Sequence, residues 1–119
     1  MSVQRGDVVL VYYPFTTSAG GKIRPALVVQ SDHNNVRLHD TIIAAITSTT
    51  HRALAEPTRL LIDVTTSEGK QTGLIRTSAL TCEHLRTISF NEIRRVIGTC
   101  PASLMMKVDY CLKASLGIP

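Results

Sequence analysis

Short apolar stretches separated by turn residues run along most of the chain, a pattern typical of a protein built from β-strands. The strands that this pattern predicts are residues 8–13, 25–30, 41–47 and 58–63, followed by GLIRTS (73–78), RTISF (86–90) and RVIGTC (95–100). The third stretch, TIIAAIT, shows no polar alternation. We therefore expect it to be buried on both faces of a sheet.

The last segment has a different period. Four apolar residues recur there at every fourth position: Leu104, Val108, Leu112 and Leu116. This spacing predicts a helix with one apolar stripe, and Gly117 is its stop signal. The whole pattern indicates a mainly β protein, a small antiparallel barrel with a C-terminal helix packed on it, in a single domain over residues 1–119.

Composition narrows the class of protein. The 119 residues carry 13 basic and 9 acidic side chains, a net charge of +4 that favours a polyanionic partner. No apolar run reaches 18 residues and the N-terminus does not resemble a signal peptide, so we expect a cytoplasmic protein without membrane contact. Because Cys82, Cys100 and Cys111 are widely spaced, we interpret them as small buried apolar residues.

The sequence lacks the common motifs for nucleotide binding and for metal-dependent catalysis. There is no Walker A loop, no GxGxxG and no HExxH, and the acidic residues are scattered. The four histidines fall in expected loops without metal-ligand spacing: His33, His39, His51 and His84. We therefore expect neither a metal site nor a cofactor.

Cations and hydroxyl groups fall at the ends of the expected strands. Arg24 follows a loop of small polar residues, 16–23, in which Gly20 and Gly21 are the expected hinge. The pair Thr47-Ser48 ends the third strand, and Arg76 and Ser78 end GLIRTS. If these ends converge on one rim of the barrel, the rim suits a phosphodiester, because guanidinium groups donate in pairs to phosphate oxygens. The alternative interpretation is two surface cations and a turn cap.

An RNA ligand would need little further chemistry from the protein. Its own 2′-hydroxyl group can act as the nucleophile, and the protein then supplies positioning, proton transfer and stabilisation of charge. No metal ion and no covalent intermediate are required.

Four segments in order resemble one protein family. RGDVVLVYYPF, KIRPALVVQS, IIAAITS and TGLIRTSALTCEHLRTISFNEIRRVIGTC resemble the MazF/PemK toxins of bacterial type II toxin–antitoxin systems. The resemblance implies an SH3-like barrel of the MazF/PemK/CcdB type that forms a homodimer. It also implies a sequence-specific endoribonuclease that cuts single-stranded mRNA without a metal ion, leaving 2′,3′-cyclic phosphate and 5′-hydroxyl ends. A cognate antitoxin is the implied partner.

The same motifs suggest roles for individual residues. Arg24 matches the catalytic arginine of the family, which stabilises the phosphate and donates a proton, and Thr47 matches its catalytic threonine. The supporting RNA-binding residues are Lys22, Pro25, Ser48, Arg76, Ser78 and Phe15. Loop residues Thr17, Gly20 and Gly21 are expected to belong to a lid. Some members carry an aspartate where this chain has Ser78, which removes that acid–base partner for Arg76.

Other interpretations stay open at this stage. The general base is unassigned, since arginine and threonine are poor bases, and His33 and His51 are candidates. A toxin of the same fold that inhibits a protein target such as DNA gyrase, in the manner of CcdB, is the main alternative function. A non-catalytic RNA-binding barrel is a further one, against which the aromatic content of 4% argues. The RNA sequence that is cut is not specified.

Overall fold

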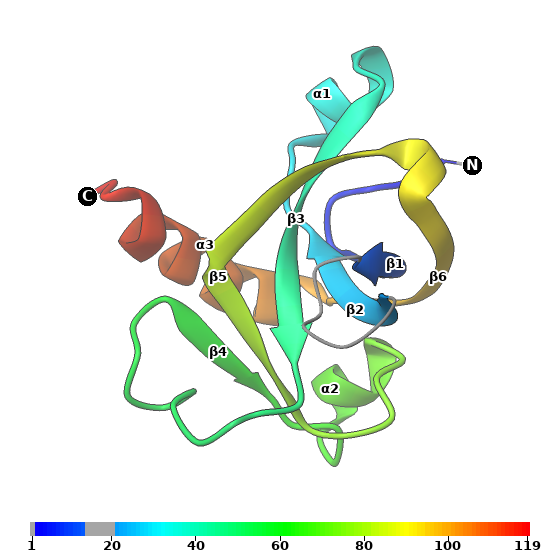
Figure 1. The fold of residues 1–119 in the computed structure, drawn as a ribbon. Helices are drawn as coiled ribbons and strands as arrows, with labels where there is room; N and C mark the ends of the chain where they lie inside the picture. Colours follow the sequence, from blue (N-terminus) through cyan, green and yellow to red (C-terminus); the bar gives the residue numbers. More distant parts are fainter. Residues whose placement is uncertain (1, 14–20) are drawn as a thin grey trace.

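Six antiparallel strands and a long C-terminal helix make up the chain in a computed structural model that describes residues 2–13 and 21–119 (Figure 1). The strands are β1 (Asp7–Tyr13), β2 (Lys22–Val28), β3 (Asp40–Thr47), β4 (Arg59–Ile62), β5 (Ser78–Ser89) and β6 (Ile93–Thr99). The helices are α1 (Asp32–Arg37), α2 (Ser67–Gln71) and α3 (Ala102–Leu116), with the 3-10 turn η1 (Phe90–Glu92) between β5 and β6. The prediction of a mainly β protein with a C-terminal helix is confirmed.

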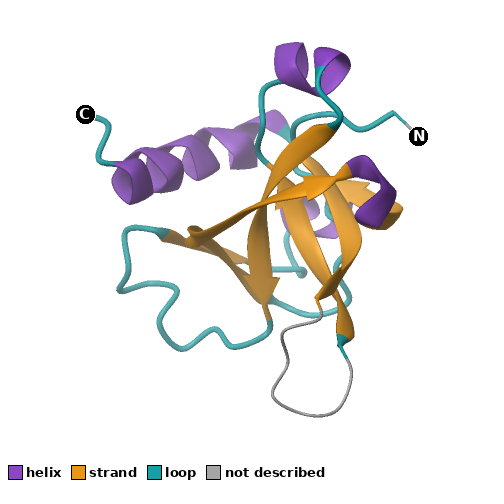
Figure 2. Cartoon of the chain, turned by 45° about the horizontal axis from the view of Figure 1, so that its top comes forward, coloured by secondary structure: helices purple, strands orange, loops and turns teal. Residues whose placement is uncertain are grey.

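The strands form one curved sheet in the order β4-β5-β3-β2-β1-β6. Among the described residues β4 and β6 are edge strands that do not pair with each other, so the sheet is barrel-like but open. Figure 2 shows the strands wrapped around one another and α3 lying outside them. No helix in the described part of the chain has the length and apolar character needed to span a membrane.

Both faces of the sheet bury apolar side chains, as expected for TIIAAIT. On β3, Ala44 and Ile46 belong to one core cluster, whereas Ile43 belongs to another on the opposite face. Successive strand residues point to opposite faces, so a strand buried on both sides reads as a continuous apolar run. The first cluster includes the buried face of α3, and the second lies on the other side of β1, β2 and β3, with residues of β5 and β6.

Two of the expected strands are wrong. Residues 73–78 form a turn and a bend, and only Ser78 is in a strand. RTISF is not a separate strand either, because residues 86–89 continue β5 and Phe90 begins η1. The sequence pattern also did not predict α1 and α2, which are short and largely polar and begin at the capping hydroxyl groups of Ser31 and Thr66.

The C-terminal helix is confirmed with one correction. Gly117 ends α3 in the left-handed conformation, as expected for a stop signal. The buried face consists of Leu104, Val108 and Cys111, whereas Leu116 is 57% exposed. A four-residue spacing exceeds the 3.6-residue turn, so each step rotates about 40° around the helix and the stripe leaves the core.

Candidate active site

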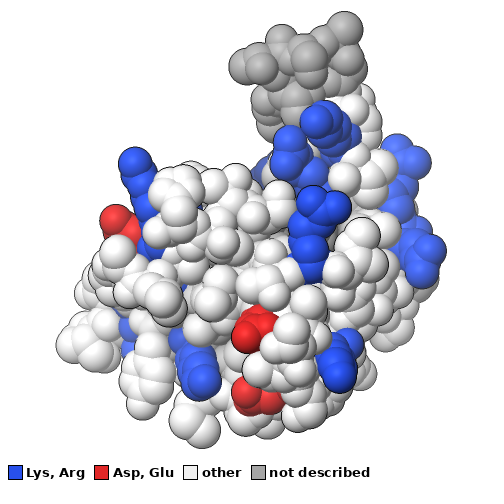
Figure 3. Space-filling view, turned by 90° about the horizontal axis from the view of Figure 1, so that it is seen from below, with Lys and Arg blue, Asp and Glu red and all other residues white. Residues whose placement is uncertain are grey.

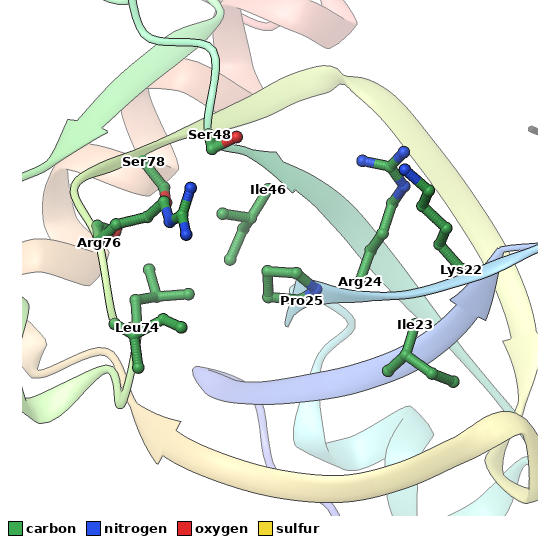
Figure 4. A pocket seen from close by; sticks show the side chains of 10 residues that line it. Lys22, Ile23, Arg24, Pro25, Ile46, Ser48, Leu74, Arg76 and Ser78 are labelled. Atoms are coloured by element: carbon green, nitrogen blue, oxygen red, sulfur yellow. The ribbon is translucent and has the colours of Figure 1, made fainter.

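A pocket of about 230 Å³ lies where β2 begins and β3 ends, beside the segment between α2 and β5. Its floor is apolar, made by Pro25, Ile46 and Leu74. Figure 4 shows Lys22 and Arg24 extending side by side from β2, with Arg76 on the opposite side of this floor. Among the predicted site residues, those that line the pocket are Lys22, Arg24, Pro25, Ser48, Arg76 and Ser78.

The electrostatic character of this pocket is positive. Three of its lining residues are cations and none is acidic. Figure 3 shows several Lys and Arg side chains gathered on this side of the molecule, with few acidic atoms among them. Because Lys22, Arg24 and Arg76 are all exposed, they can reach an anionic ligand without prior rearrangement of the core.

Pro25 explains why the pocket opens at this point. The β2–β3 ladder ends at the pair Ala26–Ala45, so the part of β2 before Ala26 pairs with β1 alone. Proline has no N–H group to donate and is tolerated where a neighbouring strand is missing. Pro25 is the fourth residue of β2, because the strand begins at Lys22 rather than at the predicted residue 25.

Thr47 does not line the pocket, but the strand register relates it to Arg24. The last β2–β3 pair is Ala26–Ala45, and Arg24 and Thr47 each lie two residues beyond it, on the side of their strand where Ala26 and Ala45 lie. Residues opposite each other in an antiparallel pair share a face. Arg24 and Thr47 therefore belong to the face of Ile43, and Ser48 follows on the other face.

The hydroxyl group of Thr47 already has one partner. Its Oγ1 accepts a hydrogen bond of 3.2 Å from the Thr49 N–H, which is the turn cap that the alternative interpretation proposed. A hydroxyl group can accept and donate at once, so its own proton remains available for a ligand. Capping the turn and binding a phosphate are compatible for this half-buried side chain.

Ser78 has a local structural partner. It is buried, and its hydroxyl group donates to the Arg76 carbonyl oxygen at 2.9 Å. The turn before it is also fixed against β6, because a Cβ atom at Gly98 would overlap the backbone of Thr72. These contacts position the segment that carries Leu74 and Arg76.

An aromatic and cationic cluster of Tyr13 and Arg86 lies near Arg24. The Arg86 guanidinium lies 5.2 Å from the centre of the Tyr13 ring, and its Nη2 donates to Glu92. Burial raises the pKa of Tyr13, and the nearby charges of Arg86 and Arg24 partly offset this rise. This cluster was not predicted from the sequence. The feature that could have indicated it is Tyr13, an aromatic residue at the end of a predicted strand and close to the expected lid.

Three of the predicted residues, Phe15, Thr17 and Gly20, lie outside the described residues. Gly21 is described, and its N–H donates to the Tyr12 hydroxyl group at 3.0 Å. A Cβ atom at Gly21 would overlap the Tyr12 ring, which gives a steric reason for glycine there. The described residues hold no group of three or more His, Cys, Asp or Glu side chains arranged for a metal ion.

Comparison with solved structures supports the fold. The MazE-MazF complex (Form-III) from Deinococcus radiodurans superposes with a TM-score of 0.75, and each chain is covered to 100% at 21% identity. Mycobacterium tuberculosis toxin MazF-mt6 gives a TM-score of 0.75 over 95% of this chain and 98% of that one, at 19% identity. At sequence identities of 19% and 21%, these two matches show that the fold is shared and no more than that.

Sequence relatives are more similar. Endoribonuclease EndoA from Bacillus subtilis (strain 168) is 35% identical over 99% of this chain and 97% of its own length. Endoribonuclease MazF from Staphylococcus epidermidis is 32% identical over 98% of this chain and 92% of its own. A family model described as a PemK-like, MazF-like toxin of type II toxin–antitoxin systems matches residues 4–116. This match takes in the whole sheet, the pocket and all of α3, so the chain belongs to the PemK-like and MazF-like toxin family.

Proposed function

We propose that this protein is the toxin of a type II toxin–antitoxin pair and acts as an endoribonuclease on single-stranded mRNA at a short recognition sequence. The observation that carries the proposal is the cationic pocket, in which Lys22, Arg24 and Arg76 surround an apolar floor. The endoribonuclease names of the two curated relatives support it. We propose the cytoplasm as its place of action.

The reaction is an attack of RNA on itself. The 2′-oxygen of one ribose forms a bond to the adjacent phosphorus, the bond from phosphorus to the 5′-oxygen breaks, and the leaving oxygen gains a proton. The products are a 2′,3′-cyclic phosphate and a 5′-hydroxyl group. Negative charge grows on the phosphate oxygens in the transition state, and stabilising this charge is the main task of the protein.

Arg24 is the residue best placed for that task. Its guanidinium is fixed in charge and donates several hydrogen bonds in a plane that matches phosphate oxygens. Thr47, on the same face of the sheet as Arg24, holds the phosphate with its remaining hydroxyl proton. Lys22, Ser48 and Arg76 contact neighbouring parts of the RNA, and Ser78 acts through the Arg76 backbone. This chemistry requires no metal ion.

The proposed protein partners are a second copy of the chain and a cognate antitoxin. Related MazF toxins have been solved in complex with MazE, and an endoribonuclease from a mycobacterial species with its cognate antitoxin. A positive pocket on the toxin suits an acidic antitoxin segment that competes with RNA.

Replacing Arg24 with alanine tests the proposal. We expect Arg24→Ala to reduce kcat for RNA cleavage by about 10²–10³-fold, because one donor to the transition-state charge is lost. The fold should persist, since Arg24 is exposed. Arg37→Ala is the matched control, because Arg37 is an exposed arginine on α1 whose side-chain hydrogen bonds go to Asn34 within the described part of the chain. Normal cleavage by Arg24→Ala would refute the site.

A further inference from the structure

The register of β5 shifts in the middle of the strand. Ala44 on β3 pairs with Leu85, but its neighbour Ala45 pairs with Thr81, so residues 82–84 have no partner on β3. Figure 1 shows that β5 bends in its middle, beside β3. Cys82 is fully buried in the first core cluster, whereas His84 is exposed. The bulge therefore presents one histidine on the surface.

Hydrogen bonding fixes the orientation of this imidazole. The Thr81 hydroxyl group donates to the Ala45 carbonyl oxygen at 2.8 Å, and a hydroxyl group has one proton to give. His84 Nδ1 lies 3.3 Å from Thr81 Oγ1 and must be the donor in that contact. In the neutral ring Nε2 then carries a lone pair, so His84 presents a hydrogen-bond acceptor.

This acceptor lies on the face that holds Arg24 and Thr47. Thr81 is opposite Ala45, and Ala79 is opposite Thr47 on the same pair of strands. Side chains in diagonal positions such as Thr81 and Thr47 are about 7–8 Å apart. Ala45 and Thr47 are only half-buried, so β3 offers an accessible strip with Arg24 on one side and His84 on the other.

The neighbouring charges leave His84 free for this role. Glu83, the adjacent acidic residue, is held by Arg59 at 2.8 Å and by the Thr58 hydroxyl group at 3.0 Å. Its carboxylate is therefore already engaged on β4. No ion pair involving His84 occurs among the described residues.

We propose that His84 is a specificity residue that contacts the nucleotide next to the cleaved bond. With the scissile phosphate held between Arg24 and Thr47, a single strand along the β3 strip brings an adjacent base to His84. Nε2 accepts a hydrogen bond from an amino or imino group of that base. The inference rests on the proposed ribonuclease function and assigns one position of the recognition sequence to one residue.

The test is cleavage of an RNA pool with randomised sequence, with the cut sites sequenced. His84→Phe keeps a planar ring but removes both nitrogens, and we expect its preference at one position beside the cut to fall by about tenfold. Its KM should rise while kcat on the best sequence stays within a few-fold. His84→Gln, which keeps an acceptor, should retain part of the preference. His39→Phe, at an exposed histidine just before β3, is the matched control and should cut like the parent protein.

The outcomes separate the inference from the function on which it rests. Discrete cutting by the parent protein, with an unchanged preference at every position in His84→Phe, would overturn the role of His84 and leave the ribonuclease intact. Equal loss of preference at all positions would also overturn it, because it would indicate a general structural effect. An intact RNA pool with the parent protein would overturn the proposed function itself.

Discussion

At the scale of single residues, two adjacent hydroxyl groups at the end of β3 serve opposite faces of the sheet. Ser48 lines the pocket with Arg76, and Thr47 lies on the face of Arg24. A phosphodiester at the end of β3 can therefore be held from two sides. Of the two, Thr47 is half-buried and already oriented by the Thr49 N–H, so it is the better fixed donor.

Thr47→Val tests the donor role of this hydroxyl group. Valine has a similar shape but cannot donate, and a hydrogen bond to a charged phosphate contributes about 1.5–3 kcal/mol. We expect kcat to fall by about 10–100-fold, while Thr47→Ser keeps most of the activity. Single-turnover cleavage of a defined RNA measures both variants.

The control for this change is Thr87→Val, an exposed threonine farther along β5. It should cleave at the parent rate. If Thr47→Val and Thr87→Val cleaved equally well, Thr47 would be a turn cap alone.

Sequence alone predicted the polar residues of the pocket and Pro25 in its floor, but not the rest of the floor. Arg24, Ser48 and Arg76 stand out because charged and hydroxyl residues at strand ends are conspicuous in an apolar pattern. Ile46 and Leu74 line the same pocket, yet in a sequence they cannot be told from core residues. His84 was missed as a candidate because its importance arises from a register shift, which requires the pairing of two strands.

At the scale of elements, β1, β3, β4 and β6 begin and end within about two residues of the predicted bounds. The prediction of a strand over residues 73–78 was wrong because the adjacent apolar residues Leu74 and Ile75 are typical of a buried strand. In the structure Ile75 is 91% exposed and lines the pocket. Apolar residues are usually buried, but those that line a surface pocket can be exposed, so the apolar pattern is misleading there. Helices α1 and α2 were missed because α1 has no buried residue and α2 buries only a glycine, so neither shows an apolar period.

Two leucines of the predicted stripe on α3 should contribute unequally to the free energy of unfolding. Leu104 is 5% exposed within the first core cluster, and Leu116 is 57% exposed at the end of the helix. We expect Leu104→Ala to lower the free energy of unfolding by about 2–5 kcal/mol, since it leaves a cavity. Leu116→Ala should change it by less than about 0.5 kcal/mol. Urea denaturation of both variants checks this, and equal effects would contradict the placement of α3.

At the scale of the whole molecule, three thiols lie in the interior. Cys82, Cys100 and Cys111 are all buried, as the sequence predicted, and none is paired in a disulfide. Burial raises the pKa of Cys82 to about 12 and that of Cys100 to about 11. The nearby Cys111 and Glu83 add to the rise at Cys82.

These raised pKa values predict a loss of stability in alkaline solution. Thiols of the unfolded chain ionise near pH 8.5, whereas the folded protein keeps Cys82 and Cys100 protonated up to about pH 11. The stabilisation is complete below pH 8.5 and falls as the pH rises toward the folded pKa values. Urea midpoints at pH 7.5, 9 and 10.5 under reducing conditions should decrease steadily. Cys82→Ala should show a smaller decrease, and an identical slope would contradict this explanation.

The fold of the whole molecule was predictable because its strands are short and separated by turn signals and its last helix has a stop residue. The open edge of the sheet and the two core clusters could not be predicted from the sequence, because both depend on which strands pair with each other. The order β4-β5-β3-β2-β1-β6 places β4 and β6 at opposite edges. Apolar periodicity within one strand carries no information on that order.

The most direct measurement is incubation of the purified protein with a long single-stranded RNA in excess EDTA, followed by mapping of the fragment ends. The proposed function predicts discrete cuts at one short recurring sequence, with 2′,3′-cyclic phosphate and 5′-hydroxyl ends and a rate that EDTA leaves unchanged. Cleavage that EDTA abolishes and Mg²⁺ restores would contradict the metal-independent reaction. Intact RNA with folded, antitoxin-free protein would contradict the ribonuclease function and direct the next experiment to a protein target such as DNA gyrase.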